Sequence, residues 1–200
     1  MNTRFPLPRG SRLVLASHNK GKLAEFSRLL DGYGITVVSA GELGLPEPDE
    51  TATTFSGNAE LKALAAAKAA NLPALSDDSG LCVSALGGAP GIYSARWAGP
   101  DKNFPAAMQR IEEGIGEDER NAWFICVLCL AFPDGTSHCF EGRIDGSISP
   151  EPRGREGHGY DPIFIPSGET RTFAEMSDAE KNRISHRARA FEAFRTACLA

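Results

Sequence analysis

The feature that most constrains the fold is a nearly unbroken apolar run at residues 123–132, which read WFICVLCLAF. A continuous run of this length, with several β-branched and aromatic residues, is typical of a strand that is buried on both faces. Pro133, Asp134 and Gly135 follow it with turn chemistry, and residues 138–144 can then return as a second strand. The pattern predicts a central hairpin in a chain of 200 residues, which is long enough to bury a sizeable core.

Strand and helix patterns alternate along the rest of the chain. Residues 13–17 and 35–39 read as strands, and the apolar spacing between them predicts a helix that ends at residues 31–34. An alanine-rich stretch at residues 59–70 predicts the next helix. Side chains that can cap or stop helices occur at the expected boundaries: Thr54 or Ser56, Asn71 with Pro73, Asn103, Ser177 and Ser185. The alternation indicates an α/β fold.

Two aspartates interrupt what would otherwise be another buried strand. Residues 75–80 read LSDDSG, and apolar residues lie on both sides of them. Successive side chains of a strand point to opposite faces, so Asp77 and Asp78 cannot both enter one site unless a turn at Asp-Ser-Gly re-aims them. A plain Asx-type turn is the alternative interpretation. The glycine-rich, aromatic loop that follows at residues 86–97 (LGGAPGIYSARW) favours a functional role for one of the carboxylates.

Residues 17–22 (SHNKGK) join the first strand to the first helix. Free amide groups at a helix N-terminus attract anions, and Lys20 and Lys22 add positive charge, so a phosphate site is physically reasonable here. The segment is not a Walker loop, because Leu23 stands where Ser or Thr should bind magnesium. A solvated loop is the alternative.

The loop of residues 41–54 is acidic. One of its carboxylates could join Asp78 around a magnesium ion, which proteins normally hold through one or two carboxylates together with substrate phosphates. An exposed connector is the alternative. Asn58 and Lys62 in the next helix share a face because they are four residues apart, and Lys62 either reaches a phosphate or is solvated.

Composition excludes several classes of function. The 21 basic and 26 acidic residues give a net charge of −5, which disfavours sequence-independent binding to nucleic acid and therefore an RNA-binding domain. The longest apolar run is too short for a membrane span. The first ten residues lack the apolar core of a secretory signal, so we expect a cytoplasmic protein with five reduced cysteines.

Cys126 and Cys129 form a C-x-x-C pair, with His138 and Cys139 across the predicted turn, and such a set is typical of zinc sites. Residues three apart on a strand face opposite sides. The two thiols therefore cannot converge on one metal without a break in the strand, which this apolar run does not indicate.

The glycines at residues 157–162 (GHGYDP) let the backbone approach a ligand closely, while Tyr160 offers a stacking face and Asp161 an acceptor. A plain turn before a strand is the alternative. Lys181 and His186 lie about 140° apart on one ideal helix, so they would not share a site there. If Ser185 caps a second helix, His186 falls in its first turn.

Five motifs in this order resemble the inosine triphosphate pyrophosphatase family: residues 17–22, 76–80, 86–96, 159–162 and 185–187. The resemblance extends over about residues 13–194 and implies an elongated mixed β-sheet with flanking helices, in two lobes with an active-site cleft between them. It implies a single domain over residues 1–200, of which residues 1–12 are expected to be a flexible extension. It also implies a homodimer that uses Mg²⁺ to hydrolyse deaminated purine nucleoside triphosphates (ITP, dITP, XTP) to the monophosphate and pyrophosphate, and so cleanses the nucleotide pool.

The same resemblance implies roles for individual residues. Asp78 would be the general base and a metal ligand, although a carboxylate on magnesium is less basic, so orienting a water describes its role better. Glu50 is the preferred second metal ligand, with Asp49 and Glu47 as rivals. The residues implied to bind substrate are Ser17, His18, Asn19, Lys20, Gly21, Lys22, Lys62, Ser79, Arg96, His158, Gly159, Tyr160, Asp161, Lys181, His186 and Arg187.

This chain departs from the family at His158, where many relatives have phenylalanine in the sequence GFGYDP. A competing hypothesis is a nucleotide-binding sensor without turnover, which would keep the phosphate loop and the purine pocket. The acidic residues around Asp78 argue against that hypothesis.

Overall fold

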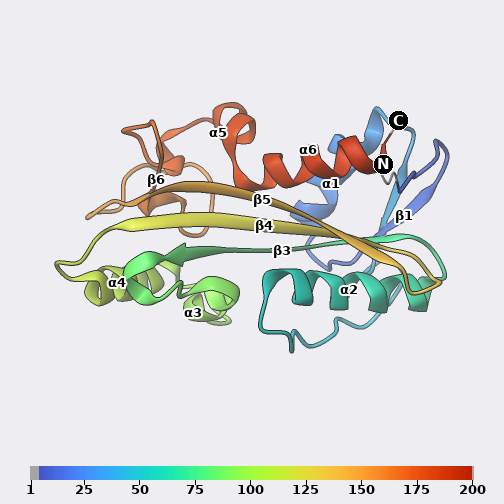
Figure 1. Cartoon of the computed structure of the whole chain (residues 1–200), viewed down its shortest axis with the longest axis horizontal. Coiled ribbons are helices and arrows are strands. Elements are labelled where there is room, and N and C mark those ends of the chain that lie inside the picture. Colours follow the sequence, from blue (N-terminus) through green and yellow to red (C-terminus); the bar gives the residue numbers. More distant parts are fainter. Residues whose placement is uncertain (1–4, 200) are drawn as a thin grey trace. The chain divides into compact units, whose positions relative to one another are not determined.

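The computed structural model describes residues 5–199 (Figure 1). Its strands form a six-stranded sheet in the order β2-β1-β3-β4-β5-β6. The chain divides into two compact units. Of the described residues, the first unit contains residues 5–78, 127–141 and 190–199, and the second contains residues 79–126 and 142–189.

The first unit begins with β1 (Arg12–Leu15), α1 (Lys20–Asp31), β2 (Thr36–Ser39) and α2 (Phe55–Ala70). β1 pairs in parallel with β2 on one side and with β3 (Ala74–Val83) on the other. Asn19 caps α1 and Thr54 caps α2, while Asn71 ends α2 in the left-handed conformation. The predicted strands, helices and stop signals of this region are confirmed.

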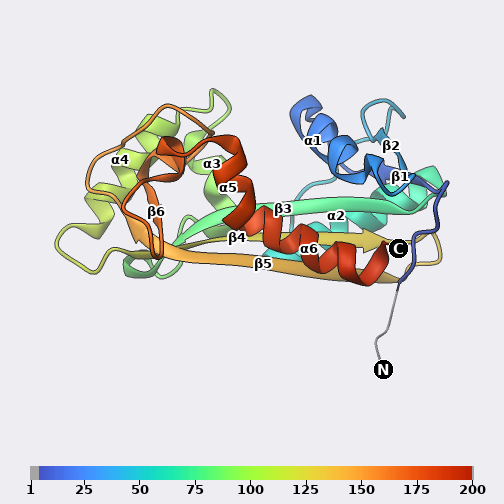
Figure 2. The ribbon, with the colours of Figure 1, turned by 90° about the horizontal axis from the view of Figure 1, so that it is seen from above.

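In the first unit, α2 covers one face of the sheet, and α1 and the end of α6 (His186–Cys198) cover the other (Figure 1). The alanines of α2 pack against Val14, Val127 and Cys129. Small side chains let the helix backbone approach the sheet closely. Along the opposite face α6 follows β5 (Ser137–Ile148), as Figure 2 shows. The rings of Phe140 and Phe194 meet edge to face at 5.6 Å.

The second unit contains α3 (Ser94–Ala98), α4 (Phe104–Ile115), β6 (Phe164–Pro166) and α5 (Asp178–Ile184). Its core is built on aromatic contacts, in which Phe124 meets Phe164 at 4.7 Å and Phe173 at 6.0 Å. Met108 and Ile111 of α4 join this core. Ser177 and Glu180 form the predicted capping box of α5, and Ser185 caps α6, so His186 does begin a second helix.

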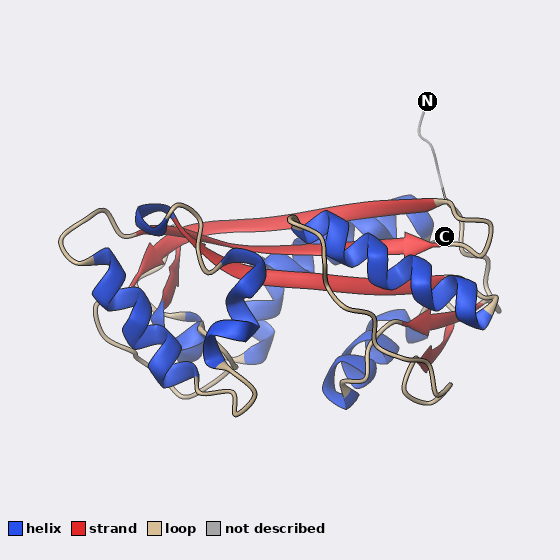
Figure 3. Cartoon of the chain, turned by 90° about the horizontal axis from the view of Figure 1, so that it is seen from below, coloured by secondary structure: helices blue, strands red, loops and turns tan. Residues whose placement is uncertain are grey.

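The predicted hairpin is present: β4 (Asn121–Ala131) is followed by the turn of residues 133–135 and then by β5. β3, β4 and β5 have 10, 11 and 12 residues and are drawn as uninterrupted strands in Figure 3. β3 contains Asp77 and Asp78 without a break. The alternative of an Asx turn at Asp-Ser-Gly is therefore wrong, because contacts from neighbouring helices compensate both charges within an extended strand.

Part of the expected N-terminal extension is packed against the first unit. The backbone N–H groups of Phe5 and Leu7 donate to the carbonyls of Ala197 and Cys198, and Leu7 is buried. Arg12 already belongs to β1. Residues 1–4 of that extension lie outside the described residues.

In the described part of the chain, no helix combines the length and the hydropathy that a membrane crossing requires.

Gly146 of β5 generates the first prediction. It is opposite Pro166 in β6, and a Cβ atom there would lie 2.2 Å from the carbonyl oxygen of Ile165. We expect Gly146→Ala to lower the free energy of unfolding by about 1–3 kcal/mol, the usual cost of overpacking. Gly32→Ala is the matched control, because Gly32 has φ −63° and a Cβ atom added there would meet no other atom within 4 Å. Urea unfolding measures both, and equal stability of the two variants would contradict the packing argument.

Candidate active site

Asp77 and Asp78 point to opposite faces of β3 and meet different lysines. Both carboxylate oxygens of Asp77 accept from Nζ of Lys22 in α1, at 2.9 and 2.8 Å. On the other face, Nζ of Lys62 in α2 lies 3.8 Å from Oδ1 of Asp78. The strand therefore presents one aspartate to each covering helix, as the alternation of side chains along a strand requires.

Lys62 is the centre of the cluster around Asp78. Its ammonium group donates to Oε1 of Glu50 at 2.7 Å and to the backbone carbonyl of Asp77 at 2.8 Å. Asn58, one helical turn earlier, hydrogen-bonds the Asp78 carboxylate through its side chain, and its own Oδ1 accepts from the N–H of Ala52 at 3.0 Å. Asn58 thus links the acidic loop to β3.

Burial controls the electrostatics of this cluster. Removal from water raises the pKa of Asp78 to about 6; nearby Lys62 opposes this effect, while Glu50 and Asp77 add to it. Burial by itself would lower the pKa of Lys62, but the surrounding carboxylates of Asp78, Glu50 and Asp77 outweigh it and raise that pKa. The lysine is therefore held charged, and the aspartate is held less acidic than usual.

The predicted phosphate loop is mainly a helix start. The side chain of Asn19 accepts from the N–H groups of Gly21 and Lys22, and Ser17 Oγ accepts from the N–H of Asn19. His18 and Lys20 are exposed. α1 has 12 residues, so its N-terminus carries the partial positive charge that favours anions.

The donor set around Asp78 fits a hard divalent cation. Oδ2 of Asp78 is buried and has no hydrogen-bond partner among the described residues, and Glu50 meets the same lysine as Asp78. Within residues 5–199, no group of three or more His, Cys, Asp or Glu side chains could hold a metal by itself. Magnesium does not need such a group, because one or two carboxylates and substrate phosphates suffice.

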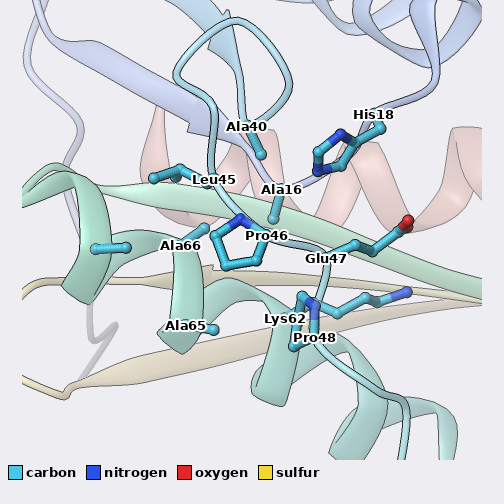
Figure 4. Close-up of a pocket in the computed structure, with 11 residues that line it drawn as sticks. Ala16, His18, Ala40, Leu45, Pro46, Glu47, Pro48, Lys62, Ala65 and Ala66 are labelled. Carbon is cyan, nitrogen blue, oxygen red and sulfur yellow. The ribbon is translucent and has the colours of Figure 1, made fainter.

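A cavity of about 90 Å³ lies beside Lys62 in the first unit (Figure 4). Alanines and prolines form most of its wall, and His18 and Glu47 contribute polar atoms. It is smaller than the pockets of about 300–1,000 Å³ that hold drug-sized ligands. Asp49, the remaining candidate ligand of the acidic loop, is exposed.

In the second unit, Asp161 organises the GHGYDP loop. Its carboxylate accepts from the backbone N–H of His158 at 2.9 Å and from Nζ of Lys181. A side chain at Gly157, which has φ +74°, would collide with Asp161 Oδ2. Asp161 therefore fixes both the loop and the position of Lys181.

Tyr160 is buried, although the sequence predicts a ring with a face on which a ligand can stack. It is 3% exposed, its hydroxyl donates to the carbonyl of Ser94 at 2.7 Å, and burial raises its pKa to about 12. Its ring packs edge to face on Phe104, so it offers no exposed face to a base. His158 is exposed and is the aromatic ring of this loop that a ligand could reach.

The other predicted substrate-binding residues of the second unit lie on α6, β3 and α3 and in the loop before Tyr160. His186 is buried at the start of α6 and stacks on Phe124 at 4.7 Å, with Arg187 next to it. Ser79 is in β3, where its hydroxyl is buried without a hydrogen-bond partner in the described chain. Arg96 of α3 lies over the Tyr93 ring at 5.2 Å. Gly159 has φ +64°.

Sequence reasoning missed two contributors. Asn58 was recognised only as a neighbour of Lys62 on one helix face, although that spacing was the signal for its role. The sequence pattern assigns a role to Asp78 and none to Asp77, but Asp77 holds Lys22. No local sequence signal identifies that contact, because its partners are 55 residues apart.

The raised pKa of Asp78 predicts a pH effect on stability in chelator-treated protein. Between about pH 4 and pH 6 the folded state binds the Asp78 proton and the unfolded state has lost it, so this group's contribution to stability falls as pH rises. Asparagine does not titrate, so Asp78→Asn lacks this loss. We expect the free energy of unfolding of Asp78→Asn, measured relative to that of wild type, to rise by about 1–3 kcal/mol from pH 4 to pH 7. Asp101→Asn, at an exposed position, is the control. Parallel curves for wild type and Asp78→Asn would contradict the burial argument.

Comparison with known proteins gives consistent results. The model of the Ham1 family matches residues 13–197. A dITP/XTP pyrophosphatase of Gluconobacter oxydans (strain 621H) is 59% identical over 191 residues, covering 95% of this chain and 92% of the relative. A second relative, a dITP/XTP pyrophosphatase of Caulobacter vibrioides (strain ATCC 19089 / CIP 103742 / CB 15), is 55% identical over 191 residues. This alignment covers 94% of this chain and 98% of the relative.

Solved structures agree with the sheet and its flanking helices. The structure of a HAM1 protein from Coxiella burnetii superimposes with a TM-score of 0.88 at 41% identity, over 93% of this chain and 97% of that one. The Staphylococcus aureus Ham1 protein gives a TM-score of 0.86 at 38% identity, over 92% and 96%. The mixed α/β fold implied by the resemblance is confirmed, and the chain belongs to the Ham1 family.

Proposed function

We propose that this protein is a pyrophosphohydrolase that cleaves dITP, ITP and XTP to the nucleoside monophosphate and pyrophosphate. The observation that carries the proposal is the cluster of buried Asp78 and Asn58 with partly buried Lys62 and Glu50, in which one carboxylate oxygen of Asp78 has no hydrogen-bond partner in the described part of the chain. Its relatives named dITP/XTP pyrophosphatases support the substrate class. Such an enzyme removes deaminated purines from the nucleotide pool before a polymerase can use them.

Phosphoanhydride hydrolysis needs positive charge around the phosphates, a metal and an oriented water. Pyrophosphatases of this family are generally metal-dependent. We assign Mg²⁺, with Asp78 and Glu50 as its protein ligands, because both supply oxygen donors within one cluster. When bound, the ion neutralises charge on the phosphates and polarises the bond that breaks.

The residues of the first unit have separate tasks in this mechanism. The partial positive charge at the N-terminus of α1 attracts phosphate oxygens, and Lys22 contributes charge when it moves from Asp77 to the substrate. Asp78 accepts a hydrogen bond from the attacking water and so orients it. Lys62 keeps Asp78 and Glu50 in place through its contacts with both.

We assign recognition of the base to the second unit. Deaminated purines present a 6-keto oxygen and an N1 hydrogen, so the site needs a donor and an acceptor in fixed positions. Lys181 and Arg187 can donate, and the pairing of Lys181 with Asp161 fixes its ammonium group. Adenine presents an amino group and an unprotonated N1, which would leave these groups unpaired.

The proposal includes a cytoplasmic homodimer. Both assignments rest on the family resemblance, and the reduced state expected for the cysteines agrees with the cytoplasm.

Product analysis tests the activity directly. Incubation of the protein with dITP and Mg²⁺ should yield dIMP and pyrophosphate, which ion-exchange chromatography separates from dIDP and phosphate. Formation of dIDP and phosphate would contradict the proposed cleavage and show that water attacks the terminal phosphorus. Tight binding of dITP without any product would instead support a nucleotide sensor.

Paired aspartate variants test the role of Asp78. We expect Asp78→Asn to lower kcat by about 10²–10⁴-fold while dITP binding survives, because α1 and Lys22 remain. Asp77→Asn should reduce kcat less and act mainly on KM, since it changes the environment of Lys22. Steady-state kinetics with circular dichroism to confirm folding gives both values. Equal losses of kcat in the two variants would contradict the assignment of Asp78 to the reaction and of Asp77 to the position of Lys22.

His158 generates a prediction about pH. If its exposed imidazole lies against the purine, protonation changes nucleotide affinity, because a histidine gains charge between about pH 7.5 and 5.5. We expect His158→Phe to preserve kcat and to flatten the pH dependence of KM for dITP across this range. His138→Phe is the control, since His138 stacks on Phe5 in the first unit. Superimposable KM profiles of wild type and His158→Phe would exclude the stacking role.

A further inference from the structure

Two cysteines of the central hairpin lie opposite each other. The N–H of Phe132 donates to the carbonyl of Thr136 at one end of the β4–β5 ladder, and the N–H of Ile148 donates to the carbonyl of Arg120 at the other, each at 2.9 Å. The two pairs share one register, so no bulge intervenes between them. That register places Cys129 directly across from Cys139, in a pair whose backbone groups do not bond each other.

This type of pair suits a disulfide. Facing residues of a non-hydrogen-bonded antiparallel pair have Cα atoms about 4.5 Å apart, within the range of about 4.4–6.8 Å that disulfides span. The thiols of Cys129 and Cys139 already hydrogen-bond each other. Formation of a bond between them therefore requires little movement of the backbone.

The two cysteines differ in access to solvent. Cys129 is fully buried against the alanines of α2, whereas Cys139 is exposed. A reagent in solution therefore reaches Cys139 first, and Cys129 is protected until the sulfur of Cys139 has reacted. Exposure of one thiol next to a second, shielded thiol is the arrangement found in redox-reactive pairs.

The same contact makes Cys139 the better nucleophile. The hydrogen bond from Cys129 lowers the pKa of Cys139, although partial burial and the charge of Glu60 oppose this effect. The pKa of Cys129 is raised, first by that hydrogen bond and then by burial. Cys139 therefore carries the larger share of thiolate, the form that attacks an oxidant.

We propose that Cys139 and Cys129 form a peroxide-reactive dithiol that closes to a cross-strand disulfide. Cys139 thiolate attacks one oxygen of hydrogen peroxide; an S–O bond forms, the O–O bond breaks, and the departing hydroxide takes a proton to become water. The sulfur of Cys129 then attacks the Cys139 sulfenic acid, so that an S–S bond forms and the S–O bond breaks. Hydroxide leaves with the proton of Cys129 as a second water, and a thiol reductant reverses the process.

The remaining buried cysteines are less reactive by the same criteria. Burial raises the pKa of Cys82 to about 11 and that of Cys198 to about 12, and Cys126 is fully buried. The proposed pair is also placed against a functional helix, because Sγ of Cys139 lies 3.9 Å from the carbonyl oxygen of Ser56 in the first turn of α2. α2 carries Asn58 and Lys62.

Thiol counting and peptide mapping test the proposal on the full chain. After treatment with hydrogen peroxide and alkylation under denaturing conditions, wild type should lose two of its five free thiols and recover them with dithiothreitol. Asp134 lies between the two cysteines, so a protease that cleaves at aspartate should release a peptide pair that stays joined until reduction. Survival of all five thiols, a disulfide between two chains, or oxidation of Cys139 with Cys129 still free would overturn the proposal.

Serine variants separate the two steps. We expect Cys129→Ser to stop at a sulfenic acid on Cys139, which dimedone traps, and Cys139→Ser to retain its thiols. Cys82→Ser is the matched control and should form the disulfide as wild type does, because Cys82 belongs to the other unit. Dimedone labelling of Cys129 in the Cys139→Ser variant would show that Cys129 attacks peroxide directly. That result would contradict the proposal that Cys139 reacts first. The wild-type peptide map remains decisive if a serine variant fails to fold.

Discussion

The compensation of two adjacent aspartates in one buried strand is the interaction on which the candidate active site depends. An isolated carboxylate in the interior is costly unless it is paired or protonated. β3 meets this cost with Lys22 on one face and Lys62 on the other, and the Asp77 carbonyl gives Lys62 a further partner. Because each helix supplies one cation, the positions of α1 and α2 on the sheet determine the charges around both carboxylates.

The composition of α2 follows from the same requirement. Its alanines face the sheet and leave little distance between the helix backbone and β3, and Ser76 Oγ of β3 donates to the carbonyl of Ala59. This close approach brings Asn58 and Lys62, one turn apart, to the level of Asp78. A larger side chain in this layer would separate the lysine from its carboxylates. The apolar packing of α2 on the sheet therefore determines the distances between the charged groups of the first unit.

Local patterns in the sequence predicted the elements well and the long-range pairings poorly. The capping box of Ser177 and Glu180, the caps at Asn103 and Ser185, and the hairpin turn depend on residues within a few positions, so periodicity and turn chemistry identify them. The continuity of β3 through its acids depends on lysines distant in sequence, and no local rule contains them. Tyr160 illustrates the same limit, since the acceptor of its hydroxyl, Ser94, is 66 residues away.

The cost of burying Asp78 also bears on the proposed binding of a cation. Its raised pKa shows that the charged form is less stable in the folded protein than in water, and one of its oxygens has no donor among residues 5–199. A divalent cation at that oxygen would supply the missing positive charge, so binding recovers free energy that the metal-free fold has lost. Protons compete for the same oxygen below about pH 6, and the affinity for the cation must fall as the carboxyl group becomes protonated. On the proposed assignment of Asp78 as a metal ligand, the cost of burying its carboxylate is thus a source of metal affinity, and its pKa sets the pH range in which that affinity is available.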